Sequence, residues 1–442
     1  MPDLRISELT MNQLIIHVVG LGVQANAKLD EYAEMALLKA DCVLGSERQL
    51  NLVSSYLSKH KNRHNDDFCQ ILPTLPELEA KLQVLQEKRF TDVVVLASGD
   101  PLYFGIGTWL NRHFSAHQIH FYPAVSSIQA ACHKLGVTLQ DAHVLSVHGR
   151  PVESIRRQLK PNRNLILLTD SKSTPQVLAQ ECIDAGLTKS ILHICEALGY
   201  ESERIRSFTA EELVRQAELG FDALNVVVIK TSNQPSFYPN FPGIADNKFV
   251  TDKGNGKGML TKRETRLSIL SLLQISDKDI VWDVGAGCGG VAIEIGYWHP
   301  QANVFAVEHN EIRQSCLEAN RTRFGVMNNV TLIAAKAPEA LQGLPKPDKV
   351  FVGGSDGNLE KIIEYCWDNL PENGVLVTSA VTEDTKMTLQ SFLQKRIAKN
   401  EATYESIQLN YAKLENLAEQ SAYRPALPVT LFCFTKQLNR TC

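Results

Sequence analysis

The chain has 442 residues, more than one ordinary hydrophobic core holds, which predicts two domains. Hydrophobic residues make up 44% and charged residues 21% of the sequence, as in an ordinary globular protein. The net charge of −4 gives no basic footprint for nucleic acid, so we expect no nucleic-acid partner.

Residues 1–13 contain two acids and no long apolar stretch, which is typical of neither a signal peptide nor a membrane span. No window elsewhere reaches eighteen uninterrupted apolar residues, so we expect a cytoplasmic protein without a membrane partner. The ten cysteines include no C-x-x-C pair. They are expected to be free thiols in a reducing compartment, and no metal site is expected.

The first half alternates apolar runs with helical patterns. Residues 14–20 end at a glycine and predict a buried strand, and residues 28–40 place their apolar side chains on one helical face. Further strands are predicted at 42–45, 92–100, 118–124, 143–149, 164–170, 191–197 and 225–230. The order of elements predicts an α/β domain with a mainly parallel sheet over residues 1–235.

Residues 231–258 contain three prolines and four glycines without sustained periodicity. Most of this stretch, 236–258, is predicted to be a linker or a loop that wraps one domain. A second α/β domain is predicted over 259–442, beginning with a helix at 262–273. Its strands are predicted at 279–285, 303–309, 329–335, 349–354, 374–381 and 429–436.

The first strand of the second domain runs into a glycine-rich loop. Gly285, Gly287 and Gly290 satisfy the dinucleotide pattern G-x-G-x-x-G. Asp283 with Gly285, Gly287 and Gly289 also satisfies D-x-G-x-G-x-G, the loop of many S-adenosylmethionine (SAM) methyltransferases. Glu308 ends the next strand, where an acid can bind both ribose hydroxyls of NAD or SAM. Asp283 favours SAM over NAD, because a carboxylate attracts a sulfonium and repels a pyrophosphate. The alternative is that the glycines only form a tight turn between a strand and a helix and bind no ligand.

Two flanking segments add to this loop. Thr261 and Glu264 have the spacing of a helix capping box. Lys262, Arg263 and Arg266 place three cations nearby, which suits a substrate rich in carboxylates, although a solvated charged face gives the same pattern. The loop 353–358 exposes backbone after a buried strand, where open α/β sheets bind ligands.

In the first half, three loops rich in small residues follow predicted strands: 20–24, 98–101 and 123–127. Together they predict one shared cleft, although each alone is an ordinary turn. The histidines at 17, 143, 148 and 193 have no metal-ligand spacing, and no Ser/His/Asp or Cys/His pattern occurs.

Several motifs resemble known families. In the first half they are VVGLG (18–22), ADCVLGSERQL (40–50), LASGDPLYFGIG (96–107), PAVSSIQAA (123–131), VHGRP (147–151), LLTD (167–170) and CEALGYESERI (195–205). In order and content this half resembles the tetrapyrrole methylases, in the cobalamin-pathway branch that methylates C5. In the second half TKRETR (261–266), VWDVGAGCGG (281–290), AKAPEAL (335–341) and VFVGGSDGNL (350–359) resemble the companion enzymes that methylate C15 and decarboxylate.

The resemblance implies a tetrapyrrole-methylase-like α/β domain followed by a Rossmann-like class I SAM methyltransferase domain, each with a SAM site. The first site would use Gly20, Gly22, Ser98, Gly99, Asp100, Tyr103, Ser126 and Ser127. The second would use Thr261, Asp283, Gly285, Ala286, Gly287, Cys288, Gly289, Glu308 and Ala337. The chain departs from the family patterns at Val23-Gln24, where G-x-G-P-G is usual, and at Lys336, where an acid is common.

The resemblance also implies a function in corrin ring biosynthesis. The expected reaction is SAM-dependent methylation of precorrin-6B, or its cobalt form, at C5 and C15 with decarboxylation of the C12 acetate, giving precorrin-8. The expected partner is therefore the tetrapyrrole substrate, and we also expect a homo-oligomer. The alternatives are an NAD-dependent oxidoreductase, a non-catalytic tetrapyrrole-binding protein, and a SAM-dependent enzyme acting on RNA.

Overall fold

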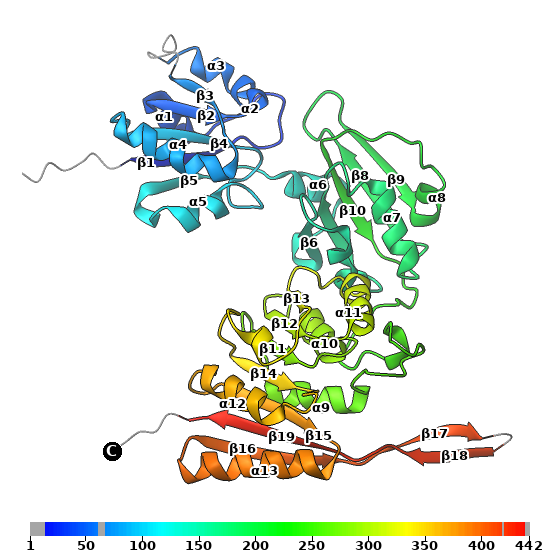
Figure 1. Ribbon diagram of the computed structural model, residues 1–442. Helices are drawn as coiled ribbons and strands as arrows, with labels where there is room; N and C mark the ends of the chain where they lie inside the picture. The colour runs from blue at the N-terminus through cyan, green and yellow to red at the C-terminus, as the bar shows by residue number, and fades with distance from the viewer. Residues whose placement is uncertain (1–13, 61–66, 418–419, 438–442) are drawn as a thin grey trace, which may run out of the picture. The chain divides into compact units, whose positions relative to one another are not determined.

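The computed structural model describes residues 14–60, 67–417 and 420–437 (Figure 1). The chain divides into two compact units, one formed by 1–152 with 161–235 and the other by 153–160 with 236–442. Residues 1–13, for which no membrane span is predicted, lie outside the described residues. Within the described ranges, no helix is long and apolar enough to cross a membrane.

The first unit begins with a parallel sheet of strand order β3-β2-β4-β1-β5. Its strands are β1 (Ile15–Gly20), β2 (Cys42–Gly45), β3 (Cys69–Ile71), β4 (Asp92–Ala97) and β5 (Ile119–Tyr122). The accompanying helices are α1 (Glu31–Lys39), α2 (Glu47–Leu52), α3 (Ser54–Leu57), α4 (Leu75–Glu87) and α5 (Gly107–His113). Strands β2 and β4 are almost wholly buried, as expected when helices cover both faces of a parallel sheet.

A second sheet in this unit has the order β6-β7-β10-β8-β9, and only β6 and β7 are parallel. Its strands are β6 (Ala142–Ser146), β7 (Asn164–Leu168), β8 (Ile191–Glu196), β9 (Arg204–Thr209) and β10 (Asn225–Lys230). Its helices are α6 (Ser127–Leu135), α7 (Pro175–Asp184) and α8 (Ala210–Val214). The prediction of one mainly parallel sheet over the first half is therefore wrong, because an apolar run reveals a buried strand but not its direction.

The second unit has a sheet of order β13-β12-β11-β14-β15-β19-β16, parallel as far as β15. Strand β19 is antiparallel to both neighbours. The strands are β11 (Ile280–Val284), β12 (Asn303–Val307), β13 (Val330–Ile333), β14 (Lys349–Val352), β15 (Val375–Ala380), β16 (Ala402–Leu409) and β19 (Val429–Lys436). Between β16 and β19, β17 (Ala412–Leu417) and β18 (Gln420–Pro425) form a ribbon that extends beyond the sheet (Figure 1).

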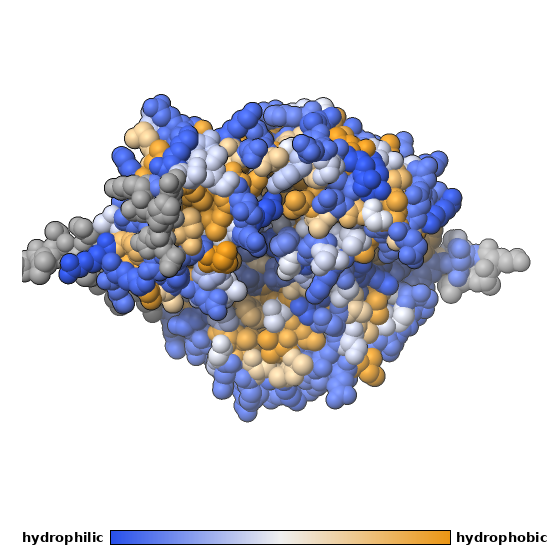
Figure 2. All heavy atoms as spheres, turned by 90° about the horizontal axis from the view of Figure 1, so that it is seen from above, coloured by the Kyte–Doolittle hydropathy of each residue, from blue (hydrophilic) through white to orange (hydrophobic). Residues whose placement is uncertain are grey.

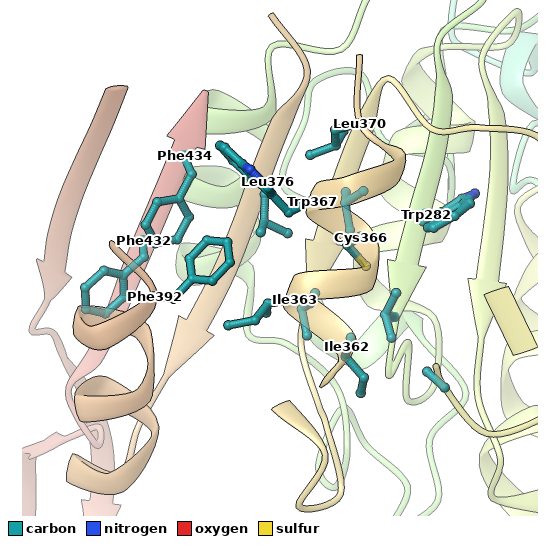
Figure 3. Close-up of a cluster of buried hydrophobic side chains, with 14 of the residues drawn as sticks. Trp282, Ile362, Ile363, Cys366, Trp367, Leu370, Leu376, Phe392, Phe432 and Phe434 are labelled. Atoms are coloured by element: carbon teal, nitrogen blue, oxygen red, sulfur yellow. The ribbon is translucent and has the colours of Figure 1, made fainter. Parts of the chain in front are cut away.

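The helices of the second unit are α9 (Arg263–Leu273), α10 (Gly290–Trp298), α11 (Glu311–Arg323), α12 (Leu359–Asn369) and α13 (Glu383–Ala398). Helix α12 presents Ile362, Ile363, Cys366 and Trp367 to the core, and Phe434 of β19 lies in the same cluster (Figure 3). These side chains are at most 2% exposed. The packing fixes the parallel strands, so the loops at their carboxyl ends have a rigid support.

Two segments outside the regular sheet pack within the second unit. In 236–258, Ile244 and Phe249 are buried, and the backbone N–H of Val250 donates to Asn320 Oδ1 at 2.8 Å. In 153–160, Ile155 and Leu159 are fully buried, and the carbonyl of Leu159 accepts from Ser236 Oγ at 2.6 Å. Hydrophilic side chains predominate on the face shown in Figure 2, and hydrophobic ones gather in several patches between them.

Candidate cofactor-binding sites

The three small-residue loops of the first unit lie together after β1, β4 and β5. Gly22 and Gly99 exchange backbone hydrogen bonds of 3.3 Å, which joins the first loop to the second. A Cβ at Gly99, where φ is +63°, would lie 3.4 Å from Ser126 Cα in the third loop. Ser126 caps α6 through its Oγ, with Ser127 as the first helical residue. The predicted convergence of these loops is thus present in the structure.

Asp100 is used to shape its own loop. Its Oδ1 accepts from the backbone N–H groups of Leu102 and Tyr103, at 2.9 and 3.1 Å, and Oδ2 lies 3.4 Å from Ala124 N. These bonds hold a turn on which Leu102, Tyr103 and Phe104 remain partly exposed. The Asp100 carboxylate therefore positions the loop. Of the two residues predicted here as ligand contacts, Asp100 and Tyr103, only Tyr103 has a side chain that is available to a ligand.

Sequence reasoning did not single out the residues that surround Ser98. Ser98 Oγ accepts from Arg48 Nη2 at 2.9 Å and from Gln49 Nε2 at 3.1 Å. Arg48 Nη1 donates to Tyr200 Oη at 3.1 Å. Arg48 and Tyr200 belong to the motifs 40–50 and 195–205, so membership of a shared motif was the available signal.

The departure at Val23 has a structural counterpart. Gly199 has a φ of +79°, and a Cβ there would lie 1.4 Å from the carbonyl oxygen of Val23. The carbonyl of Gly199 also accepts from the N–H of Ala25 at 3.3 Å. The loop after β8 therefore presses against the first glycine loop, and only glycine fits at that point.

In the second unit, the loop between β11 and α10 requires three of its glycines. Gly285, Gly287 and Gly289 have φ of +73°, +59° and +88°, whereas Gly290 is the first residue of α10. A Cβ at Gly285 would lie 2.4 Å from the Gly354 carbonyl oxygen, and one at Gly287 would lie 2.5 Å from that of Met259. The glycines that the backbone demands are those of the D-x-G-x-G-x-G pattern.

Two buried carboxylates adjoin this loop. Glu308 Oε2 accepts from the N–H of Gly287 at 2.9 Å, and Oε1 accepts from Asn310 N at 2.8 Å. Asp283 Oδ2 accepts from Ala292 N at 2.9 Å, while its buried Oδ1 has no partner among the described residues. Burial raises the pKa of Asp283 to about 7, and the nearby Glu308 adds to the rise. An unsatisfied buried acceptor is costly, so this corner suits a ligand with positive charge or hydrogen-bond donors.

The remaining predicted residues lie around the same loop. Ala286 N donates to the Val307 carbonyl at 3.0 Å. The Cys288 thiol is buried, which raises its pKa to about 12, and it lies 3.7 Å from Asp252 Oδ1. Ala337 is 8% exposed. The neighbouring Lys336 pairs with Asp356 at 2.9 Å, which joins the loop after β13 to the loop after β14.

The predicted capping box is wrong. Helix α9 begins at Arg263 with Lys262 as its N-cap, and the Lys262 side chain makes no capping hydrogen bond. Thr261 therefore lies outside the helix, and its carbonyl accepts from Arg266 Nη1 at 2.5 Å. The N–H of Arg263 is satisfied instead by Asp246 Oδ1 at 3.1 Å, which belongs to the segment predicted as a linker.

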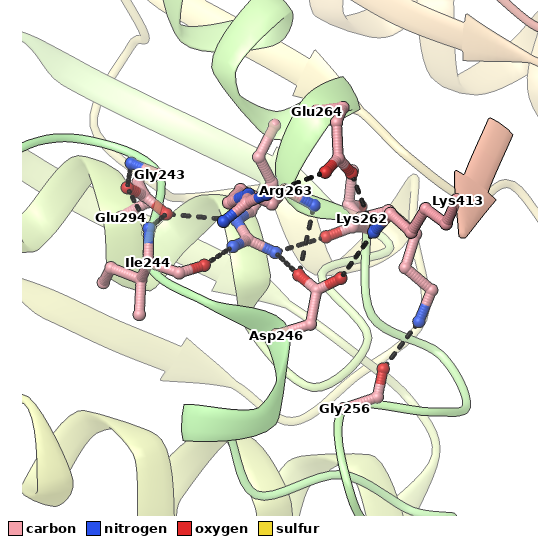
Figure 4. A network of polar contacts seen from close by, with 11 residues as sticks. Gly243, Ile244, Asp246, Gly256, Lys262, Arg263, Glu264, Glu294 and Lys413 are labelled. Atoms are coloured by element: carbon pink, nitrogen blue, oxygen red, sulfur yellow. Dashed lines mark hydrogen bonds and ion pairs between the residues drawn. The ribbon is translucent and has the colours of Figure 1, made fainter. Parts of the chain in front are cut away.

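Arg266 must also be corrected, because its side chain is completely buried. Figure 4 shows its partners Glu294, Asp246 and Ile244 lying close together. Its guanidinium pairs with Glu294 at 3.1 Å and Asp246 at 2.9 Å and donates to the carbonyl of Ile244. With the Thr261 carbonyl, these partners use four of its five N–H groups, and complete burial keeps the guanidinium away from a substrate carboxylate. Arg266 therefore ties α9 and α10 to the segment 236–258.

The other two cations of this segment differ in exposure. Lys262 Nζ donates to the carbonyl of Gly256 at 2.6 Å, and Arg263 pairs with Glu264 at 3.2 Å with 49% of its side chain exposed. Lys413 of β17 also reaches Glu264, at 3.0 Å, which the sequence did not indicate. Of the three predicted cations, Arg263 keeps the most accessible charge.

Comparison with known proteins shows what these loops belong to. The family model of tetrapyrrole (corrin/porphyrin) methylases matches residues 16–214, and that of the precorrin methyltransferase domain matches residues 252–436. A cobalt-precorrin-7 C(5)-methyltransferase of Salmonella typhimurium is 31% identical over 191 residues, covering 43% of this chain and 89% of its own.

Two longer relatives span nearly the whole sequence. A precorrin-6Y C(5,15)-methyltransferase (decarboxylating) of Mycobacterium tuberculosis is 30% identical over 426 residues, covering 96% of this chain and 100% of its own. One of Sinorhizobium is 33% identical over 439 residues, covering 99% of this chain and 100% of its own. Both halves and their order are matched, and the chain belongs to the family of decarboxylating precorrin-6Y C5,15-methyltransferases.

Proposed function

We propose that this chain uses SAM to methylate precorrin-6B, metal-free or as its cobalt complex, at C5 and C15. Carbon dioxide is lost from the C12 acetate, and precorrin-8 is the product. The family membership supports this reaction. We assign the C5 step to the domain 1–235 and the C15 step with decarboxylation to 259–442, as the motif resemblances imply. Two separate family models match these parts, which supports two catalytic domains.

The main observation in favour of a SAM site in the second unit is that the buried carboxylate of Asp283 lies next to the glycine loop. The loop is tight enough to require glycine at 285, 287 and 289, and the unpaired Asp283 Oδ1 is buried beside it. We assign Glu308 to the ribose hydroxyls, because its carboxylate is fixed by two backbone donors and has further lone pairs to use. Thr261, Ala286, Cys288 and Ala337 complete the proposed site.

The first unit offers an independent site. Gly20, Gly22 and Gly99 bring backbone from two strand ends together without intervening side chains, and Ser98, Tyr103, Ser126 and Ser127 surround them. The two sets of loops belong to different sheets, which supports two SAM molecules per chain.

SAM supplies an electrophilic methyl group, and an electron-rich carbon of the macrocycle is the nucleophile. The protein therefore needs no nucleophile of its own, and its residues act by holding the two reactants in line. Such alignment contributes about 7–11 kcal/mol to a reaction barrier. For the decarboxylation, the conjugated macrocycle accepts the electron pair left by carbon dioxide, and we assign Arg263 to a substrate carboxylate.

The reaction is tested by incubating the protein with SAM and precorrin-6B, with and without cobalt, and measuring the mass of the product by mass spectrometry. We expect a gain of two methyl groups and the loss of one carbon dioxide. Calorimetric titration with S-adenosylhomocysteine (SAH) should give two molecules bound per chain. If the mass of the tetrapyrrole stayed unchanged, or if the protein oxidised or reduced its substrate with NAD, the proposed function would be wrong.

Glu308→Ala separates the two steps. We expect this variant to bind one SAH, to lose C15 methylation and to keep C5 methylation. Glu308 belongs to the second unit, so its removal affects only the SAM site of that unit. Glu360→Ala is the matched control, since Glu360 is an exposed acid of α12 paired with Lys395 at 3.3 Å. Retention of two SAH sites in Glu308→Ala would contradict the assignment of this strand end.

We also propose a homo-oligomer. Among the described strands, β16 is the last of its sheet, and its side chains are largely exposed, which supports pairing between the β16 edges of two copies. Sedimentation of the full chain measures this directly, and a single species at the mass of one chain would contradict it.

A further inference from the structure

We propose that Arg48, Ser98 and Tyr200 form a carboxylate-binding subsite beside the glycine loops of the first unit, and that it holds a carboxylate of the macrocycle. This inference rests on the proposed C5 methylation, because it takes the substrate from there. It adds a specificity-determining group, Arg48, that lies outside the proposed SAM contacts.

The subsite is built from a fixed helix start. Ser46 caps α2, and its N–H donates to Gln49 Oε1 at 2.7 Å. Because that bond fixes the orientation of the buried Gln49 amide, Nε2 is directed to Ser98 Oγ, 3.1 Å away. Arg48 is one residue earlier on the same helix and reaches the same oxygen at 2.9 Å.

Within the cluster, the oxygens of Ser98 and Tyr200 act as hydrogen-bond acceptors, so their hydroxyl protons remain available to a ligand. Ser98 Oγ accepts from both Arg48 and Gln49, so its two lone pairs are used and its hydroxyl proton is free to donate. Tyr200 Oη accepts from Arg48 Nη1, and its own proton is likewise available. A guanidinium has five N–H donors, of which the structure uses two. Three side chains thus present donors to one place, which suits an anion.

Among the residues that the structure describes, no acid forms an ion pair with Arg48. Its partners within the described residues are the two neutral hydroxyl groups of Ser98 and Tyr200, and its side chain is exposed. Of the two acids in the adjoining loop, Glu203 is occupied by Lys134 and by the N–H of Gly199, and Glu201 is exposed and forms no ion pair with Arg48 in the described part of the chain. A guanidinium held in place without a counter-charge is suited to a planar carboxylate.

The position of the cluster connects it to the reaction. Ser98 directly precedes Gly99, which pairs with Gly22, so the donors adjoin the proposed SAM loops. Tyr200 follows Gly199, whose close approach to Val23 fixes the loop after β8 against the first loop. Both the macrocycle and SAM carry carboxylates, and the experiment has to separate these sources.

The test compares Arg48→Gln and Tyr200→Phe with the wild-type chain. For Arg48→Gln we expect the KM for the precorrin in C5 methylation to rise about tenfold or more, as loss of a charged hydrogen bond implies, with SAH affinity unchanged. Tyr200→Phe should raise KM less, because it removes one neutral donor and one support of Arg48 but leaves the charge of the guanidinium in place. Arg48→Lys should raise KM less than Arg48→Gln does, since lysine keeps the positive charge but lacks the planar, bidentate donors of the guanidinium. Arg215→Gln, at an exposed arginine after α8, is the control.

Each outcome decides the proposal. Weakened SAH binding with an unchanged precorrin KM would assign the subsite to the carboxylate of SAM and overturn ours. Unchanged KM and SAH affinity would overturn it as well, while C5 methylation by the wild type would leave the proposed function intact. Circular dichroism of Arg48→Gln establishes that the variant is folded. A wild-type chain that forms no C5-methylated product would remove the proposed function and this subsite together.

Discussion

Asp283, near the end of β11, has an unsatisfied environment beside the glycine loop of the second unit. Its carboxyl is 1% exposed, one oxygen accepts a single backbone bond, and the other has no partner in the described part of the chain. Burial raises its pKa from 3.8 to about 7. A position that destabilises the folded chain in this way is understandable where a cationic ligand binds.

The raised pKa of Asp283 predicts how stability depends on pH. Between pH 4 and 7 the folded chain keeps a proton that the unfolded chain has lost, so the free energy of unfolding falls as pH rises through this range. The full difference corresponds to about 4 kcal/mol. Urea unfolding followed by tryptophan fluorescence should show this fall, because three of the four tryptophans, Trp282, Trp298 and Trp367, lie in the same unit as Asp283, and Asp283→Asn should remove it. Equal slopes in both proteins would contradict the assigned environment.

Individual residues were predictable where the backbone dictates the residue type. Asp283 and Glu308 follow from their places at strand ends, and Gly285 follows from the turn. Arg266 shows the limit, because its sequence neighbours Lys262 and Arg263 are partly accessible whereas Arg266 is fully buried. Its partners Asp246 and Glu294 are 20 and 28 residues away, and nothing local in the sequence announces them.

At the scale of elements, the loop from β11 to α10 depends on close contact with the loop after β14. Gly285 lies against the backbone of Gly354, whose N atom would be 2.7 Å from an added Cβ. The loop therefore has a shape set by two strand ends, and a methyl group at Gly285 would force them apart.

This contact predicts a difference between two glycine substitutions. Gly343→Ala has a φ of +80° with no atom within 4 Å, so it carries backbone strain alone, about 1 kcal/mol. Gly285→Ala adds the overlap with Gly354, and we expect it to cost about 3 kcal/mol or more and to abolish SAH binding in the second unit. Thermal unfolding and calorimetry measure both effects. Equal losses in the two variants would show that the contact is unimportant.

Most strands of both units were predictable, because continuous apolar runs mark buried strands. Strand β9, with the sequence RIRSFT, and the exposed strands β16 to β18 were not predicted, since charged residues interrupt any apolar pattern there. Strand β3 was also missed, because its three residues are too few to form a pattern. The direction of β8 and β10 was also hidden, because hydrophobic periodicity does not encode pairing. Tertiary hydrogen bonds decide it.

At the scale of the whole molecule, the sequence boundary near residue 235 is only one of the borders. Residues 153–160 come from the middle of the first half but belong to the second unit. Arg156 Nη1 donates to the Thr322 carbonyl at 2.7 Å, and Gly325 allows the chain to pass close to Glu153. No composition shift marks this octapeptide, so sequence reasoning could not find it.

Gly325→Ala tests how firmly the octapeptide is held. An added Cβ would lie 2.1 Å from the Glu153 carbonyl oxygen at a φ of +65°. We expect the variant to lower the melting temperature and to admit protease cleavage between residues 153 and 160. Gly254→Ala, with a φ of +69° and no atom within 4 Å, is the control for backbone strain. Resistance to cleavage equal to that of the control would contradict the tight packing.

The placement of the octapeptide bears on how this polypeptide can be divided. A gene split at the codon for Ser236 would leave Ile155 and Leu159 on the first product, whereas the surroundings that bury them would be encoded by the second. Each product would then be synthesised with an uncovered apolar surface. Independent production of the two catalysts would require a redesigned turn after β6 and a replacement cover for the carboxyl-terminal fragment.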